Sequence, residues 1–102
     1  MVNWSSSLYV GESVFNRQKK IIKKIGKRKF TFNVYCIAYA SNKENLFDII
    51  SANELLFPVY KKLDVCIVGI AGSREEAQEL VMDMVIKVYS DTGGFAVREY
   101  FK

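Results

Sequence analysis

Residues 64–94, DVCIVGIAGSREEAQELVMDMVIKVYSDTGG, decide the fold, because a buried-strand pattern runs directly into the longest helical pattern of the chain. Residues 64–71 are nearly all apolar and lack the alternation of a half-exposed strand, which predicts a central strand that is parallel to a neighbour. Ser73 and Glu76 form a capping box, and two glycines follow the helical pattern, so we expect a helix over residues 74–90. A strand followed by a helix favours a layered arrangement.

The segments upstream add two strands and a basic helix. Residues 8–10 predict a short strand that ends at Gly11. Residues 12–27 place apolar side chains on one side and Lys and Arg on the opposite side at helical spacing, which is typical of an amphipathic helix. Residues 30–40, FTFNVYCIAYA, are rich in aromatic and β-branched residues and alternate. This pattern predicts a strand whose even-numbered side chains pack beneath a helix.

Between these two regions, shorter signals indicate one more strand and a short helix. Residues 46–50 predict a short strand or an extended segment that leads into a helix. Ser51 and Glu54 form a second capping box at the start of that helix. Pro58 predicts a kink or an early stop before Tyr60, because its ring clashes with a preceding carbonyl.

Residues 95–101 alternate again and predict a last strand, at the edge of the sheet. Strands and helices therefore follow one another along the chain, which favours an α/β fold. We expect a small three- to four-stranded, mostly parallel or mixed sheet with three helices, in a single compact domain over residues 1–102. The alternative is an α+β two-layer sandwich.

The composition excludes several classes of enzyme. The 102 residues include no histidine, so Ser-His-Asp triads and Cys-His dyads are absent. Cys36 and Cys66 are far apart and form no C-x-x-C pair, so we expect no metal, no thioredoxin-like site and no cofactor. Both lie in apolar runs and are interpreted as small buried hydrophobic residues in a reducing compartment, with a disulfide between them left open.

Membrane signals are missing from the sequence. No stretch approaches the ~18 consecutive apolar residues of a transmembrane helix. Residues 1–9 lack the basic start and apolar run of a signal peptide. We therefore predict a cytoplasmic protein that does not bind membranes.

Positive charge is concentrated in the first third of the chain. The net charge is +4, and residues 1–30 carry eight Lys and Arg against a single acid, Glu12. This segregation indicates a nucleic acid or another polyanion as partner, or attraction between copies of the chain. The candidate nucleic-acid-binding residues are Arg17, Lys20, Lys23, Lys24, Lys27, Arg28 and Lys29. The aromatic residues expected to stack on unpaired bases beside them are Phe30, Phe32, Tyr35 and Tyr39. The alternative is that the charges are only the solvated side of an amphipathic helix.

Two sets of apolar residues exceed what one sheet face and one helix side would bury. Exposed apolar patches mark interfaces, and twofold dimers are the commonest assemblies, so we predict a homodimer. The candidate interface residues are Tyr35, Ile37, Tyr39, Met82, Ile86 and Tyr89. The alternative is a sheet with helices on both faces, which would cover the tyrosines within one copy.

Two further clusters have simpler explanations. Residues 69–73 lie between a strand and a helix like a phosphate-binding turn, but three glutamates in the following two helical turns would repel an anion, so we interpret a capped turn. The polar residues 42–45, with Asp48 and Glu54 nearby, would supply carboxylates to an enzyme. No nucleophile, base or metal set assembles there by spacing, and turn chemistry explains the asparagines.

Four short motifs carry a resemblance to known proteins: Ser41-Asn42, residues 45–49 (NLFDI), residues 92–95 (TGGF) and residues 97–100 (VREY). With them the chain is similar to short proteins of Gram-positive, clostridial-type bacteria. The resemblance implies no activity, and it carries over no functional residue.

Three classes of function follow from these observations. The first is a non-enzymatic interaction module that acts as a homodimer with an accessory or regulatory role. The second is a nucleic-acid-binding protein that uses the basic helix at residues 12–29. The third and least supported is a small enzyme with a carboxylate such as Asp48. Salt separates the first two, because phosphate binding weakens steeply with ionic strength and an apolar dimer does not.

Overall fold

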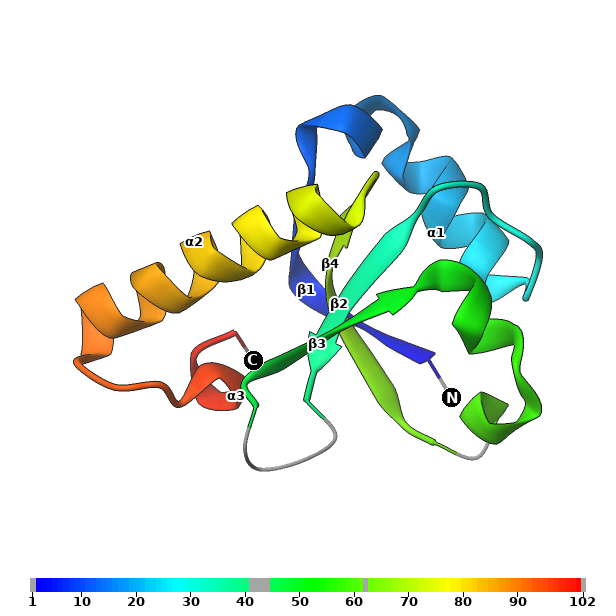
Figure 1. The fold of residues 1–102 in the computed structure, drawn as a ribbon. Coiled ribbons are helices and arrows are strands. Elements are labelled where there is room, and N and C mark those ends of the chain that lie inside the picture. The colour runs from blue at the N-terminus through cyan, green and yellow to red at the C-terminus, as the bar shows by residue number, and fades with distance from the viewer. Residues whose placement is uncertain (1, 41–44, 62, 102) are drawn as a thin grey trace.

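The computed structural model, described over residues 2–40, 45–61 and 63–101, contains a four-stranded mixed sheet (Figure 1). The strands, in the spatial order β1-β4-β2-β3, are β1 (Val2–Val10), β2 (Tyr35–Tyr39), β3 (Phe47–Ser51) and β4 (Val65–Ala71). β1 pairs in parallel with β4, whereas β2 is antiparallel to both β4 and β3. The small α/β fold with a mixed sheet is therefore confirmed, and β4 is a central strand with one parallel neighbour.

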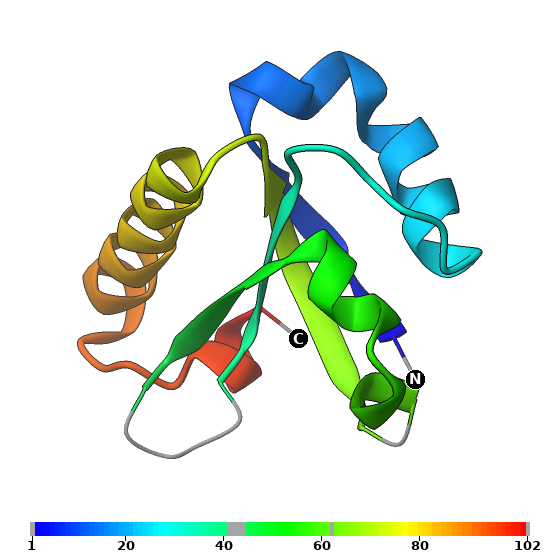
Figure 2. The ribbon, with the colours of Figure 1, turned by 45° about the vertical axis from the view of Figure 1, so that its right-hand side comes forward.

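Helices cover both faces of the sheet (Figure 2). On one face lies α2 (Arg74–Thr92), and on the other lie the 3₁₀ helix η1 (Glu12–Arg17) and α1 (Gln18–Gly26). β4 supplies both cores: Ile67 and Ile70 join the α1 side, and Val68 and Ala71 join the α2 side. The shorter helices are η2 (Ala52–Leu56), η3 (Pro58–Lys61) and α3 (Val97–Tyr100).

The start and end of α2 follow the sequence signals. The Ser73 hydroxyl oxygen accepts a hydrogen bond from the Glu76 N–H at 3.1 Å. Gly93 adopts a left-handed φ of 76° and donates its N–H to the Tyr89 carbonyl. The Glu76 carboxylate does not return to Ser73 as a full capping box requires, because it accepts from Gly72 and Ser13 instead. The helix continues two residues beyond the predicted end.

The first third of the chain differs from the prediction in its boundaries. β1 begins at Val2 rather than at residue 8, because Val2, Asn3 and Trp4 already pair with β4. The register then shifts, and Tyr9 and Val10 pair with β4 again. Residues 12–27 start as a 3₁₀ helix and become α-helical only at Gln18. Residues 30–34 are not part of a strand, since left-handed φ values of 57° at Arg28 and 52° at Asn33 keep the chain out of the sheet until Tyr35.

The region around Pro58 contains one confirmed prediction and one that was wrong. The capping box predicted at Ser51 and Glu54 was wrong, because the segment forms the tight 3₁₀ helix η2 and the Ser51 side chain makes no capping hydrogen bond to it. The early stop is confirmed: η2 ends at Leu56, and Pro58 begins η3, where its missing N–H costs nothing. The strand predicted at residues 46–50 is β3.

The edge strand predicted at residues 95–101 was wrong. This segment forms the short helix α3, and Val97 and Phe101 are buried in the α2-side core. The two residues are four positions apart, so a helical turn places both on the same side. The edges of the sheet are formed by β1 and β3.

Candidate nucleic-acid interface

The seven predicted basic residues lie on η1, α1 and the loop that follows α1. We call residues 27–33, KRKFTFN, the basic loop, and we call the seven residues together with Phe30 and Phe32 the basic surface. All seven are exposed or half-exposed. Arg17, Lys20 and Lys24 line a small hollow of about 110 Å³ that also includes Phe32. Arg28 and Lys29 line a larger cavity, and Lys23 and Lys27 line neither.

The basic loop is held at its centre by one side chain. Thr31 is only 3 % exposed, and both of its backbone polar groups are bonded to Asn53 of η2. The Thr31 N–H donates to Asn53 Oδ1 at 2.8 Å, and Asn53 Nδ2 donates to the Thr31 carbonyl at 2.7 Å. The flanking residues point the other way, since Phe30 is 64 % exposed and Phe32 is 73 % exposed. The loop is therefore fixed to the fold while it presents two aromatic rings to solvent.

The exposure of these two rings corrects the strand pattern. We expected the even-numbered side chains of residues 30–40 to be buried together. Those from residue 34 to residue 40 are buried, but Phe30 and Phe32 are not. The alternation of FTF fits a loop with a buried centre as well as it fits a strand.

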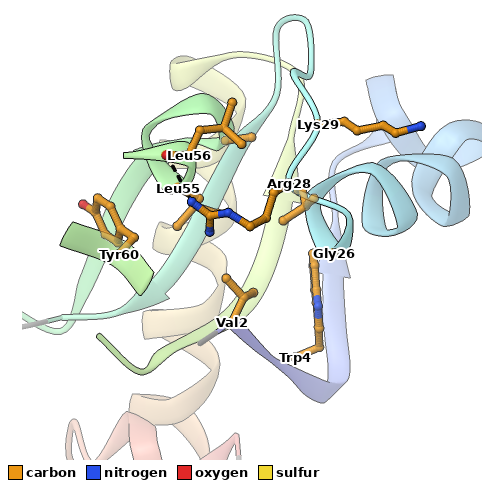
Figure 3. Close-up of a pocket in the computed structure, with 10 residues that line it drawn as sticks. Val2, Trp4, Gly26, Arg28, Lys29, Leu55, Leu56 and Tyr60 are labelled. Atoms are coloured by element: carbon orange, nitrogen blue, oxygen red, sulfur yellow. Dashed lines mark hydrogen bonds between the residues drawn. The ribbon is translucent and has the colours of Figure 1, made fainter. Parts of the chain in front are cut away.

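A cavity of about 390 Å³ opens beside the basic loop, between β1, the end of α1 and η2 (Figure 3). Its walls are mostly apolar, with Trp4 from β1, Leu55 from η2 and Tyr60 from η3. The Arg28 guanidinium extends across it and donates to the Leu56 carbonyl at 3.0 Å, whereas the Lys29 side chain points away. The cavity thus combines aromatic and aliphatic walls with one cation.

Neither Trp4 nor Tyr60 was found from the sequence, although both carry the chemistry of a binding site. They belong to elements that are more than fifty residues apart. Only the arrangement of η3 near the start of β1 brings them together. The one signal available in the sequence was that Trp4 is the single tryptophan of the chain.

The tyrosines of β2 do not join the basic surface. Tyr35 and Tyr39 lie on the α2 face of the sheet, because odd-numbered residues of β2 point away from α1. The Arg74 guanidinium lies over the Tyr35 ring at 5.3 Å, and that of Arg98 lies over the Tyr39 ring at 5.1 Å. The expectation that these two rings stack beside the basic helix was therefore wrong.

The predicted dimer residues are divided by the fold. Ile37 is fully buried under α2, and Tyr35 and Tyr39 are half-buried there, as the alternative of helices on both faces of the sheet predicted. The other three candidates lie on the outer side of α2, where Met82, Ile86 and Tyr89 remain exposed. Only the α2 part of the predicted interface is thus available to a partner.

A second cavity, of about 510 Å³, lies where β2 and β4 separate. It brings together Tyr39, Asp48, Cys66 and Arg98, which the sequence gave no reason to associate. The Tyr39 hydroxyl is buried and has no hydrogen-bond partner among residues 2–40, 45–61 and 63–101. Arg98 Nη2 donates to the Ala40 carbonyl at 2.6 Å.

The two cysteines are free thiols. Burial raises the pKa of Cys36 to about 12. Burial also raises the pKa of Cys66, an effect that the nearby Arg98 guanidinium partly opposes. Both thiols are therefore protonated near neutral pH, which makes them weak nucleophiles.

The remaining sequence candidates are the turn at residues 69–73, the polar turn, Asp48 and Glu54. At residues 69–73, the Gly72 N–H is already bonded to the Glu76 carboxylate at 2.7 Å, so the turn is capped from within. Asp48 is half-buried on β3, and Glu54 is exposed on η2. Residues 42–44 of the polar turn lie outside the described residues. Within the part of the chain that the structure describes, no three Cys, Asp or Glu side chains gather as metal ligands would.

Comparison of the chain with protein-family models, curated proteins and solved structures found no match. Across the described residues, no helix has the length and apolar character needed to cross a bilayer.

Proposed function

We propose that this protein binds single-stranded nucleic acid on the basic surface. The observation that carries the proposal is the pair of exposed rings, Phe30 and Phe32, on a loop whose centre is buried and bonded to Asn53. Exposed phenylalanines cost free energy in water unless a partner covers them, and the faces of unpaired bases are suitable partners. The surrounding cations supply the attraction for phosphates.

The positions of the positive charges suit a single strand of nucleic acid that crosses the basic loop. On one side of it, Arg17, Lys20 and Lys24 surround the hollow that includes Phe32. On the other side, Arg28 lies in the cavity walled by Trp4 and Tyr60. A backbone that follows the lysines would place one base on Phe32, a second on Phe30 and a third at the Trp4 cavity.

Lysines outnumber arginines on this surface, which indicates binding with little sequence preference. Lysine contacts a phosphate as a point charge, whereas arginine forks read base edges. A single strand is favoured over a duplex, because stacking on phenylalanine requires bases that are not already stacked in pairs. Two free cysteines suit a reducing compartment, and we place the protein in the cytoplasm.

Fluorescence anisotropy of a labelled oligouridine and of a labelled oligothymidine tests the proposal, with the matching duplexes for comparison. We expect tighter binding of the single strands than of the duplexes. The logarithm of the affinity should fall with the logarithm of the salt concentration with a slope of about 2 for three phosphate contacts. Quenching of Trp4, the single tryptophan, provides a second readout at the cavity.

Variants separate stacking from charge. Phe30→Ala and Phe32→Ala should each weaken binding by roughly 5- to 150-fold, the range of one lost stacked base, with the salt slope unchanged. Lys24→Ala should reduce the slope by about 0.7. Phe95→Ala and Lys87→Ala, exposed residues at the far end of α2 and beyond it, are the matched controls. Equal losses in the controls, or no binding by the unaltered protein at low salt, would contradict the proposal.

A homodimeric interaction module is the second candidate. The observation that favours it is the exposure of Met82, Ile86 and Tyr89 on the outer side of α2. α2 lies on the opposite side of the sheet from α1 (Figure 2), so symmetric pairing of two copies through α2 would leave the basic surface open.

A further inference from the structure

The outer side of α2 carries a line of acidic and apolar residues. Glu75, Glu79, Met82, Ile86 and Tyr89 follow one another at alternating spacings of four and three, which confines them to an arc of about 80° at 100° per residue. We call these five residues the acidic stripe. Met82 is 64 % exposed, Ile86 56 % and Tyr89 55 %, and the Tyr89 ring stacks on the exposed Phe95 at 5.3 Å.

The stripe is separate from the side of α2 that the fold uses. Ala77, Met84 and Val88 are fully buried against the sheet. The stripe lies on the opposite side of the helix, where the described part of the chain leaves it open. A contiguous apolar line of this kind, with Met and Tyr in it, has the composition of an interface core.

Charge identifies the kind of partner. The stripe contains two carboxylates and no Lys or Arg, and the exposed Asp83 lies beside it. The two positively charged side chains of α2 interact with residues outside the stripe: Arg74 lies over the Tyr35 ring, and Lys87 pairs with Asp91. Two stripes packed together would bring no opposite charges into contact. A basic partner with exposed apolar groups complements the stripe in both respects.

The chain itself carries such a surface. α1 has four lysines and no acid, and Phe30 and Phe32 are exposed immediately after it. α1 and α2 lie on opposite faces of the sheet (Figure 2), so one copy cannot bring its two surfaces together. We propose that the acidic stripe of one copy binds the basic surface of a second copy, head to tail.

This contact has two physical consequences. Each bound pair leaves one stripe and one basic surface free to bind further copies. The assemblies should therefore grow larger as the protein concentration rises, instead of stopping at a dimer. Nucleic acid on the basic surface would displace the second copy, a consequence that rests on the proposed function. The contact itself does not depend on nucleic-acid binding.

Sedimentation of complementary variants tests the contact without nucleic acid. The stripe variant combines Met82→Ser and Ile86→Ser, and the basic variant combines Lys20→Gln, Lys23→Gln and Lys27→Gln. All five side chains are exposed, so both variants are expected to fold. We expect each variant alone to be monomeric and their equimolar mixture to form a one-to-one pair and nothing larger. Val59→Ser, which removes an equally exposed apolar side chain on η3, should assemble like the unaltered protein.

Two results would overturn the proposal. One is a chain that stays monomeric at low salt and high concentration. The other is a basic variant that still associates with itself while the stripe variant is monomeric. That result would indicate that two copies pair symmetrically through α2. The association should also weaken by at least about tenfold between about 50 and 300 mM salt. The stripe variant keeps the basic surface, so its binding of oligouridine tests the proposed function whatever the outcome for assembly.

Discussion

The amide side chain of Asn53 holds the centre of the basic loop. Its oxygen accepts from the Thr31 N–H and its nitrogen donates to the Thr31 carbonyl, so it replaces the partners that a neighbouring strand would supply. Both Thr31 groups would otherwise be buried without a hydrogen bond, which is costly. The exposure of Phe30 and Phe32 follows from this anchor.

Asn53→Ala should lower the free energy of unfolding by about 1–3 kcal/mol, because both hydrogen bonds to the Thr31 backbone are lost and two buried backbone groups are left unsatisfied. It should also weaken oligouridine binding although it removes no charge. Urea unfolding followed by Trp4 fluorescence measures the first effect, and anisotropy measures the second. Asn16→Ala, at an exposed position of η1, is the matched control. Normal binding by a destabilised Asn53→Ala protein would show that the loop needs no anchor.

Tyr39 presents the opposite situation, a buried polar group with no partner among the described residues. Removing an unsatisfied hydroxyl removes a desolvation cost, so Tyr39→Phe should leave the protein as stable as before or raise its free energy of unfolding by up to about 1 kcal/mol. Urea unfolding provides the measurement. A loss of stability of more than about 1 kcal/mol would mean that the hydroxyl finds a partner, such as water, in the cavity beside β4.

At the scale of elements, the Glu76 carboxylate joins the start of α2 to the start of η1. It accepts from the Gly72 N–H at 2.7 Å, from the Ser13 hydroxyl at 2.7 Å and from the Ser13 N–H at 3.2 Å. Close approach is required here, because a Cβ on Gly11 would collide with the Glu76 side chain. Partial burial acts to raise the pKa of Glu76, but these three hydrogen bonds outweigh it and hold the pKa below its usual value.

The lowered pKa of Glu76 predicts a pH-dependent contribution to stability. The contribution is fully present above the pKa of about 4.3 that glutamate has in an unfolded chain, and it is lost as the pH falls through the lower pKa of the folded state. The unaltered protein should therefore be more stable than Glu76→Gln at pH 7, and the difference should shrink below about pH 4. Thermal unfolding across this range measures it. Glu75→Gln, which removes the neighbouring carboxylate and leaves these three hydrogen bonds in place, is the matched control.

Elements whose signals are local could be predicted from the sequence, and those that depend on distant partners could not. β4 could be predicted from its apolar run and α2 from its N-terminal cap, because each of these signals lies within a few consecutive residues. Residues 30–34 and 95–101 also alternate, but period-two patterns fit a pinned loop or a helical turn equally well. Whether such a segment becomes a strand depends on whether neighbouring strands pair with it. In this chain β3 and β4 pair with β2 from Tyr35 onward.

The same distinction applies to the candidate site. The basic residues follow one another along one helix and loop, so their grouping could be predicted. The anchor Asn53 and the aromatic walls from Trp4 and Tyr60 come from three separate elements, and only the fold brings them to the basic loop. Tyr35 and Tyr39 were wrongly grouped with the basic residues, because the sequence does not indicate on which side of β2 the basic helix lies.

At the scale of the whole molecule, the sheet separates charge of opposite sign. The basic surface lies on the α1 face and the acidic stripe on the α2 face, with two apolar cores between them. The proposed head-to-tail contact would therefore be strongest when little salt is present, because opposite charges then attract one another with the least screening. Increasing salt screens this attraction while the cores are unaffected.

Small-angle X-ray scattering would detect this behaviour in the unaltered protein. The single chain has a Cα radius of gyration of 13.1 Å and extents of 39 × 30 × 22 Å. In low salt the measured radius should rise with protein concentration, and in salt of about 0.3 M or more, where the screening length is only a few ångströms, it should return to the single-chain value. An apolar α2 dimer would instead give a radius that salt does not reduce. Adding oligouridine in low salt should also reverse the growth, because the strand and the second copy occupy the same lysines.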